Sequence, residues 1–205
     1  MPRTVAILVI AVAAMAVACP GQRRPPDGGG DGDRFGVYRG RFIDPEHSSS
    51  KFKVLLFAAL PDRFHAEVLP PVGGPALIID GGSGRLAVTV NSREAAWVGE
   101  AREEVLEAIL GFPVTLESLV SALIQGTALS GPVEISRTPR TGAGLPRSFE
   151  LGLGGRELRL ELQRTSKRGR GSYAIGTGTP PPGVDVHPLD DLVSDGAPLL
   201  FSAGD

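Results

Sequence analysis

The stretch Arg63 to Val68, RFHAEV, alternates strictly between polar and apolar side chains. Arg63, His65 and Glu67 fall on one side of an extended strand, while the phenylalanine, alanine and valine between them fall on the other. Alternation at period two is typical of a sheet with one wet face and one apolar face. The stretch therefore predicts an antiparallel sheet whose apolar side needs a cover.

Similar strand patterns continue from this stretch toward both ends of the chain. Gly81-Gly82-Ser83-Gly84 separates two short apolar runs, which predicts a hairpin. Leu158, Leu160 and Leu162 alternate with charged residues as cleanly as the first stretch does. Besides residues 63–68, we expect strands at residues 35–43, 51–60, 76–80, 85–90, 94–98, 133–137, 148–153, 156–164 and 172–176.

The middle of the chain changes to a helical period. Residues 103–110 place apolar side chains three and four positions apart, and this pattern stops at Gly111. Thr115 is suited to cap a second helix, which continues to Gly126. Glycine just after the last helical residue is a common helix ending. We therefore expect two short helices inserted between the strands.

Together these elements predict a mainly β (α+β) domain. We expect a curved antiparallel sheet, or half-barrel, with two short helices covering an apolar cavity, because such short helices cover only part of the apolar face. A closed core would give the same sequence pattern, so a cavity and an ordinary core both stay open at this point. The candidate lining residues are Val54, Leu56, Phe64, Val68, Ile78, Leu86, Val88, Leu106, Ile109, Leu123, Leu158, Leu160 and Leu162.

The first 18 residues have the pattern of an export signal. Arg3 precedes an apolar run from Val5 to Ala18, and this run is shorter than the roughly 20 residues that a membrane-spanning helix needs. The run ends in Ala16-Val17-Ala18-Cys19, which resembles the lipobox of bacterial lipoproteins. That resemblance implies removal of residues 1–18 and lipid attachment to Cys19. A plain signal peptide followed by an incidental cysteine is the alternative.

The remaining composition fits an exported chain with one folded domain. Cys19 is the only cysteine, so the chain has no internal disulfide. Residues 19–34 consist of Pro, Gly, charged and polar residues after Cys19, which predicts a flexible linker. Residues 35–176 are the expected domain, and the Pro/Gly-rich tail at 177–205 keeps enough apolar side chains to pack in part. With 21 Lys+Arg against 23 Asp+Glu, no nucleic-acid partner is expected.

Three segments, in their order along the chain, resemble the LolA/LolB family of lipoprotein carriers and receptors. Residues 64–73 resemble its strand leading into a Pro-Leu-Gly loop, with Val72 in place of the leucine. Residues 105–126 resemble its two helices joined by an aromatic-proline link, here containing Phe112. Residues 155–163 resemble its late strand. The resemblance covers roughly residues 35–176, although the family's helix before the first strand is missing.

This resemblance implies a membrane-anchored lipoprotein that binds acyl chains and takes part in the reception or insertion of outer-membrane lipoproteins or lipids. The implied partners are acyl chains, the membrane and a periplasmic LolA-like carrier, with the protein a monomer. Leu69 and Val72 would contact the membrane from an exposed loop; a rigid turn with these side chains folded inward is the alternative. Pro20 after Cys19 favours the outer membrane, facing the periplasm, over the inner membrane.

The sequence does not indicate an enzyme. His47, His65 and His187 are far apart and lack metal-ligand spacing. Ser83 lacks the second glycine of a nucleophile elbow, because Arg85 occupies that position. We therefore expect no catalytic residue, metal or cofactor. The alternative to lipid binding is a structural envelope lipoprotein with a filled core, which scaffolds another envelope protein.

Overall fold

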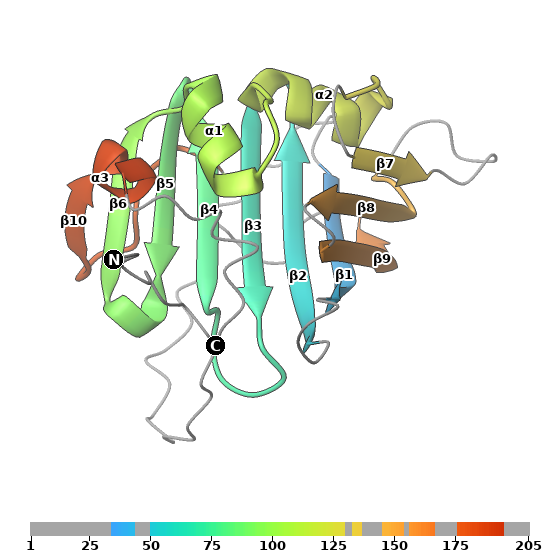
Figure 1. The fold of residues 1–205 in the computed structure, drawn as a ribbon, viewed down its shortest axis with the longest axis horizontal. Helices are drawn as coiled ribbons and strands as arrows, with labels where there is room; N and C mark the ends of the chain where they lie inside the picture. Colours follow the sequence, from blue (N-terminus) through green and yellow to red (C-terminus); the bar gives the residue numbers. More distant parts are fainter. Residues whose placement is uncertain are drawn as a thin grey trace, which may run out of the picture.

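The computed structural model describes residues 34–43, 50–129, 133–136, 145–153, 156–166 and 176–194. Within these ranges, strands form a single sheet and three α-helices pack against it (Figure 1). The strands are β1 (Arg34–Ile43), β2 (Ser50–Ala59), β3 (Arg63–Leu69), β4 (Leu77–Gly82), β5 (Arg85–Val90), β6 (Ala95–Glu100), β7 (Val133–Ser136), β8 (Ser148–Leu153), β9 (Arg156–Ser166) and β10 (Asp185–Pro188). The helices are α1 (Glu103–Leu110), α2 (Leu116–Gln125) and α3 (Leu189–Ser194), with a 3₁₀ turn at Asn91–Arg93. Cys19, residues 1–33 and most of the expected strand 172–176 lie outside the described residues.

The order across the sheet is β10-β6-β5-β4-β3-β2-β1-β9-β8-β7. Every neighbouring pair is antiparallel except β10 and β6, which run parallel. The mainly β fold and the two inserted helices are therefore confirmed. The half-barrel is not, because the sheet is neither closed nor strongly curled. The physical reason is that alternation assigns side chains to faces but is the same for a flat and a curved sheet.

Both predicted helices begin and end at the expected residues. Gly111 and Gly126 end α1 and α2 in the left-handed conformation, with φ of 85° and 81°. The Thr115 hydroxyl accepts a hydrogen bond from the Ser118 backbone N–H at 3.2 Å, which caps the start of α2. None of the described helices is long and apolar enough to cross a bilayer.

The main core lies between one face of the sheet and the two helices. Figure 1 shows α1 and α2 near one end of the central strands. The pairing aligns Leu56, Ala66 and Ile79 across three strands on this face. The largest buried side chains facing them come from α1, α2 and their link, namely Val105, Leu106, Ile109, Phe112 and Val120. This face is the apolar one that the alternation predicts, and we call it the helix face.

The C-terminal segment covers part of the opposite face, which we call the outer face. The backbone N–H groups of Thr177 and Gly178 donate to Asp80 Oδ1, each at 2.9 Å. The chain then forms β10 beside β6, and Leu189 of α3 is buried with 2% exposure. The tail is thus built into the edge of the sheet. Residues 176–178 lie over β3, β4 and β5, since Gly176 and Gly178 approach Phe64, Gly81 and Arg85 closely.

This covering segment corrects the expectation that Arg63, His65 and Glu67 lie on a wet face. His65 and Glu67 are both buried, with 8% exposure each. Sequence alternation places them on the outer face, as observed, but it does not reveal a cover that comes from about a hundred residues later in the chain. Part of the outer face is therefore a second buried region of the protein, and its side chains are polar.

Candidate functional site

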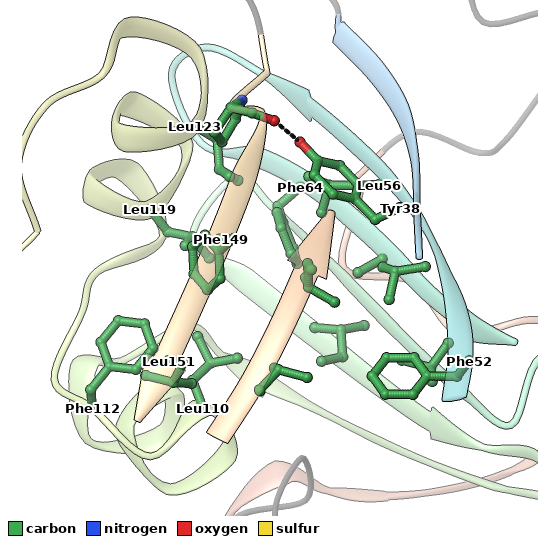
Figure 2. A pocket seen from close by; sticks show the side chains of 17 residues that line it. Tyr38, Phe52, Leu56, Phe64, Leu110, Phe112, Leu119, Leu123, Phe149 and Leu151 are labelled. Carbon is green, nitrogen blue, oxygen red and sulfur yellow. Dashed lines mark hydrogen bonds between the residues drawn. The ribbon is translucent and has the colours of Figure 1, made fainter. Parts of the chain in front are cut away.

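An apolar pocket lies between the helix face and the side chains of α1, α2 and the link between them. Its empty space is about 750 Å³, including the part open to solvent at its mouth. The lining residues are Tyr38, Phe52, Val54, Leu56, Phe64, Ala66, Val68, Ile79, Leu110, Phe112, Leu119, Leu123, Pro146, Phe149, Leu151, Leu158 and Leu160 (Figure 2).

The floor of the pocket follows from strand register. Val54 pairs with Tyr38 of β1 on one side and with Val68 of β3 on the other, so all three project from the same face. Gly40 lies beside Phe52 in the neighbouring pair, and a Cβ atom there would be only 2.1 Å from the phenylalanine ring. Because Gly40 has no side chain, the Phe52 ring can lie across β1.

The roof and the far wall come from separate parts of the chain. The end of α1 contributes Leu110, the link contributes Phe112, and α2 contributes Leu119 and Leu123. Their placement depends on the left-handed turn at Gly111 and on the cap at the start of α2. Strands β8 and β9 supply the far wall. Figure 2 shows Phe112 and Phe52 at opposite ends of the lining.

The lining has one polar side-chain atom, and that atom is already bonded. The Tyr38 hydroxyl donates to the carbonyl oxygen of Pro146 at 2.9 Å, and Tyr38 is 1% exposed (Figure 2). Every other lining side chain is a hydrocarbon. A ligand in this space would gain hydrophobic contact and would find no side-chain charge to orient it.

Seven of the predicted lining residues line the pocket, and six do not. Those in the pocket are Val54, Leu56, Phe64, Val68, Leu123, Leu158 and Leu160. Leu86, Val88, Leu106 and Ile109 instead fill the core between sheet and helices, with at most 1% exposure. Leu162 packs against that core without reaching the pocket.

Ile78 lies on the outer face, because it pairs with Glu67 and Thr89. Its neighbour Ile79 projects into the pocket instead. Two adjacent isoleucines give no indication of which one faces the core, so this position was assigned to the wrong face. Sequence reasoning also missed Phe52, although it alternates in phase with the predicted Val54 and Leu56 of β2, and Tyr38, which pairs with Val54 from β1.

The loop between β3 and β4 has a fixed base and an exposed tip. Ala76 N–H donates to Val68 O at 2.8 Å, and the Asn91 side chain donates to the carbonyl oxygen of Pro75. Val72 is 67% exposed at the tip, whereas Leu69 is half-buried at the end of β3. Of the two proposed membrane-contacting residues, Val72 is the one that projects into solvent.

A cluster of buried polar side chains lies on the outer face, on the other side of the sheet from the pocket. His65 Nδ1 is 2.7 Å from Asp80 Oδ2, and His65 Nε2 is 3.1 Å from Glu67 Oε1. Burial lowers the pKa of His65, but hydrogen bonds to Asp80 and Glu67 outweigh it and raise this pKa to about 9. Asp80 also accepts the two N–H groups of residues 177 and 178. The cluster therefore ties the C-terminal segment to the sheet.

The cluster does not have the arrangement of a metal site. Its two carboxylates contact different nitrogens of one imidazole ring. They therefore lie on opposite sides of the ring and do not converge on one position where a metal ion could be bound. In the part of the chain that the structure describes, no three His, Cys, Asp or Glu residues are placed to hold a metal ion. The cluster instead consists of buried ion pairs that hold the C-terminal segment against the sheet.

Comparison with known proteins gives no family. No protein-family model matches this chain, and no curated protein matches it. The functional interpretation therefore depends on the pocket. Its described lining is hydrocarbon apart from one paired phenol, and it offers neither a nucleophile nor a carboxylate or imidazole for acid–base chemistry. Such a site is suited to holding an apolar chain.

Proposed function

We propose that this protein is a membrane-anchored lipoprotein that binds acyl chains in the pocket on the helix face. The observation that carries the proposal is the lining, in which the single polar side-chain atom is paired with a backbone carbonyl. A pocket with such a lining would be filled by water only at a cost, because the water would find few partners. Fatty tails are ligands of matching chemistry.

The energetics favour a long hydrocarbon. Each methylene taken out of water contributes about 0.8 kcal/mol. An acyl chain of about 16 carbons would therefore gain on the order of 10 kcal/mol before the costs of ordering and association. This gain needs no polar anchor in the pocket, and a headgroup or an attached protein would remain at the mouth.

The finer proposal is a role in the reception or insertion of outer-membrane lipoproteins or lipids, as in the LolA/LolB family. It is supported by the order of strands, paired helices and strands, and by the exposed Val72 in the loop that resembles the receptor's leucine loop. In this proposal Cys19 carries the lipid anchor, and a periplasmic LolA-like carrier delivers the cargo. The membrane lies within reach of the Val72 loop.

The test is acyl-chain binding by the chain from Pro20 onward, which retains every described residue. A dansyl-labelled fatty acid should become brighter on binding, and lipid extracted from the purified protein should be detectable by mass spectrometry. Leu160→Trp should reduce binding, because Leu160 lines the pocket and is only half-buried, so a larger ring would fill the space. Leu162→Trp is the matched control: it is half-buried on the same strand but lies outside the pocket.

Two results would count against acyl-chain binding. One is the absence of both dye uptake and co-purified lipid in a protein that melts cooperatively. The other is equal loss of binding in the Leu160 and Leu162 variants, which would mean that the dye binds elsewhere. Either result would leave the scaffolding role as the better proposal.

A further inference from the structure

Four basic residues lie together on the outer face of β1 and β2. Arg39 pairs directly with Lys53, and Arg41 pairs directly with Lys51. All four are exposed, and they alternate with side chains that point to the helix face. We call Arg39, Arg41, Lys51 and Lys53 the basic patch.

This pairing is unfavourable within the protein itself. Like charges directly opposite each other on neighbouring strands destabilise a sheet, and here two such pairs are adjacent. On its other side Arg39 pairs directly with Glu161 of β9, so one acidic residue lies beside the patch, and Arg39 donates to the amide oxygen of Gln163 at 3.4 Å. A local arrangement that opposes folding is expected where function requires it.

Acidic residues farther along the sheet are engaged by another arginine. Arg159 of β9 lies opposite Arg41 and forms ion pairs with Glu150 at 3.1 Å and with Glu157 at 2.9 Å. Arg159 therefore holds both glutamates, which together carry one negative charge more than it carries positive charge. The basic patch places four exposed cationic side chains in two neighbouring cross-strand pairs of a chain whose formal net charge is −2.

The basic patch lies at the same end of the sheet as the exposed loop. Lys53 pairs with Leu69, the last residue of β3, and the chain continues from there to Val72 at the tip. Figure 1 shows the β3–β4 loop at the end of the sheet where β2 begins. Positive charge beside an exposed apolar tip is the combination found in segments that bind the surface of anionic membranes.

The same end of β2 also reaches the pocket. Phe52 lies between Lys51 and Lys53 in the sequence, and its ring lines the pocket on the other face. Alternation along one strand thus places cations outside and a pocket wall inside. A surface that attracts the two lysines would be held next to this end of the pocket.

We propose that the basic patch and the Val72 loop dock this protein onto a membrane surface that carries anionic phospholipid headgroups. An acidic protein partner would be attracted by the same charges, but it would not account for an exposed valine between prolines and glycines at the adjoining loop tip. The inference goes beyond acyl-chain binding, because docking requires no ligand in the pocket. An experiment can therefore disprove membrane docking without disproving acyl-chain binding, and the reverse.

The experiment is co-sedimentation of the chain from Pro20 onward with vesicles. We expect binding to vesicles of phosphatidylcholine mixed with phosphatidylglycerol, little binding to phosphatidylcholine alone, and release at high salt. Each basic residue near such a surface contributes a factor of about five in affinity, so Lys51→Gln with Lys53→Gln should weaken binding roughly 30-fold. The matched control, Arg85→Gln with Arg102→Gln, removes two positive charges away from the patch and should retain most of the binding.

Several results would overturn the proposal. They are equal binding to both kinds of vesicle, equal loss in the two double variants, or capture by immobilised polyglutamate without any binding to anionic vesicles. The last result would identify an acidic protein as the partner. Dansyl fatty acid binding by the lysine variant should remain unchanged, so failure of docking and failure of acyl-chain binding can be told apart.

Discussion

Raising the pH should weaken the fold through one buried residue, His65. Its pKa is raised from 6.5 to about 9 in the folded protein, because the hydrogen bonds to Asp80 and Glu67 outweigh the effect of burial. The folded state therefore binds the proton more tightly than the unfolded state does. This contribution to stability is fully present below pH 6.5 and is lost as the pH rises to about 9.

The magnitude follows from the size of the shift. One pKa unit corresponds to 1.36 kcal/mol, so the folded protein should lose about 3 kcal/mol of unfolding free energy over this pH range. That is a large part of the 5–15 kcal/mol that stabilises a typical domain. The loss should loosen residues 177 and 178 first, because they are bonded to Asp80, the carboxylate nearest the imidazole.

The assay is urea unfolding at closely spaced pH values from 6 to 10, for the wild type and two variants. His65→Gln should lower stability below pH 7 and should remove most of the downward slope above it. His187→Gln is the control, because this histidine lies exposed on β10 and should keep the wild-type slope. Parallel pH curves for the wild type and His65→Gln would refute the reasoning.

Three further substitutions test other parts of the molecule. Gly40→Ala should cost about 1–3 kcal/mol in urea unfolding and weaken dansyl fatty acid binding, because the new methyl would displace the Phe52 ring; Gly152→Ala, where nothing lies within 4 Å, should change neither. Val72→Glu should abolish delivery of lipid to vesicles and leave the melting temperature nearly unchanged, because the side chain is 67% exposed; normal delivery would exclude the loop. Thr115→Ala should cost about 1 kcal/mol by removing the α2 cap, and Thr115→Ser should restore it.

The parts of this fold that the sequence predicts well are those determined by local chemistry. Gly111, Thr115 and Gly126 determine helix ends through backbone conformation and one side-chain bond, and these do not depend on distant residues. Strict alternation likewise assigned Phe64 and His65 to opposite faces. These features can be predicted because they depend only on residues that are close together in the sequence.

The parts that the sequence does not predict depend on contacts between distant segments. The burial of His65 requires residues 176–178 to cross β4, and nothing near residue 65 indicates that cover. The sequence predicts that the Pro- and Gly-rich tail packs in part, but not that β10 within it pairs with β6. The distinction between Leu106 in the core and Leu123 in the pocket likewise depends on where each helix lies over the sheet.

The pocket follows from the mismatch between a wide sheet and small helices. Strands are spaced about 4.8 Å apart, and a helix with its side chains is about 10 Å wide, so each helix covers roughly two strands. Helices α1 and α2 therefore cover only part of the apolar face, and the pocket lies between them and side chains of β1 to β4, β8 and β9. A fully packed core would require larger side chains opposite Ala66 or a longer α2. Filling the space from within, as in Leu160→Trp, should therefore stabilise the empty protein while it excludes the fatty acid.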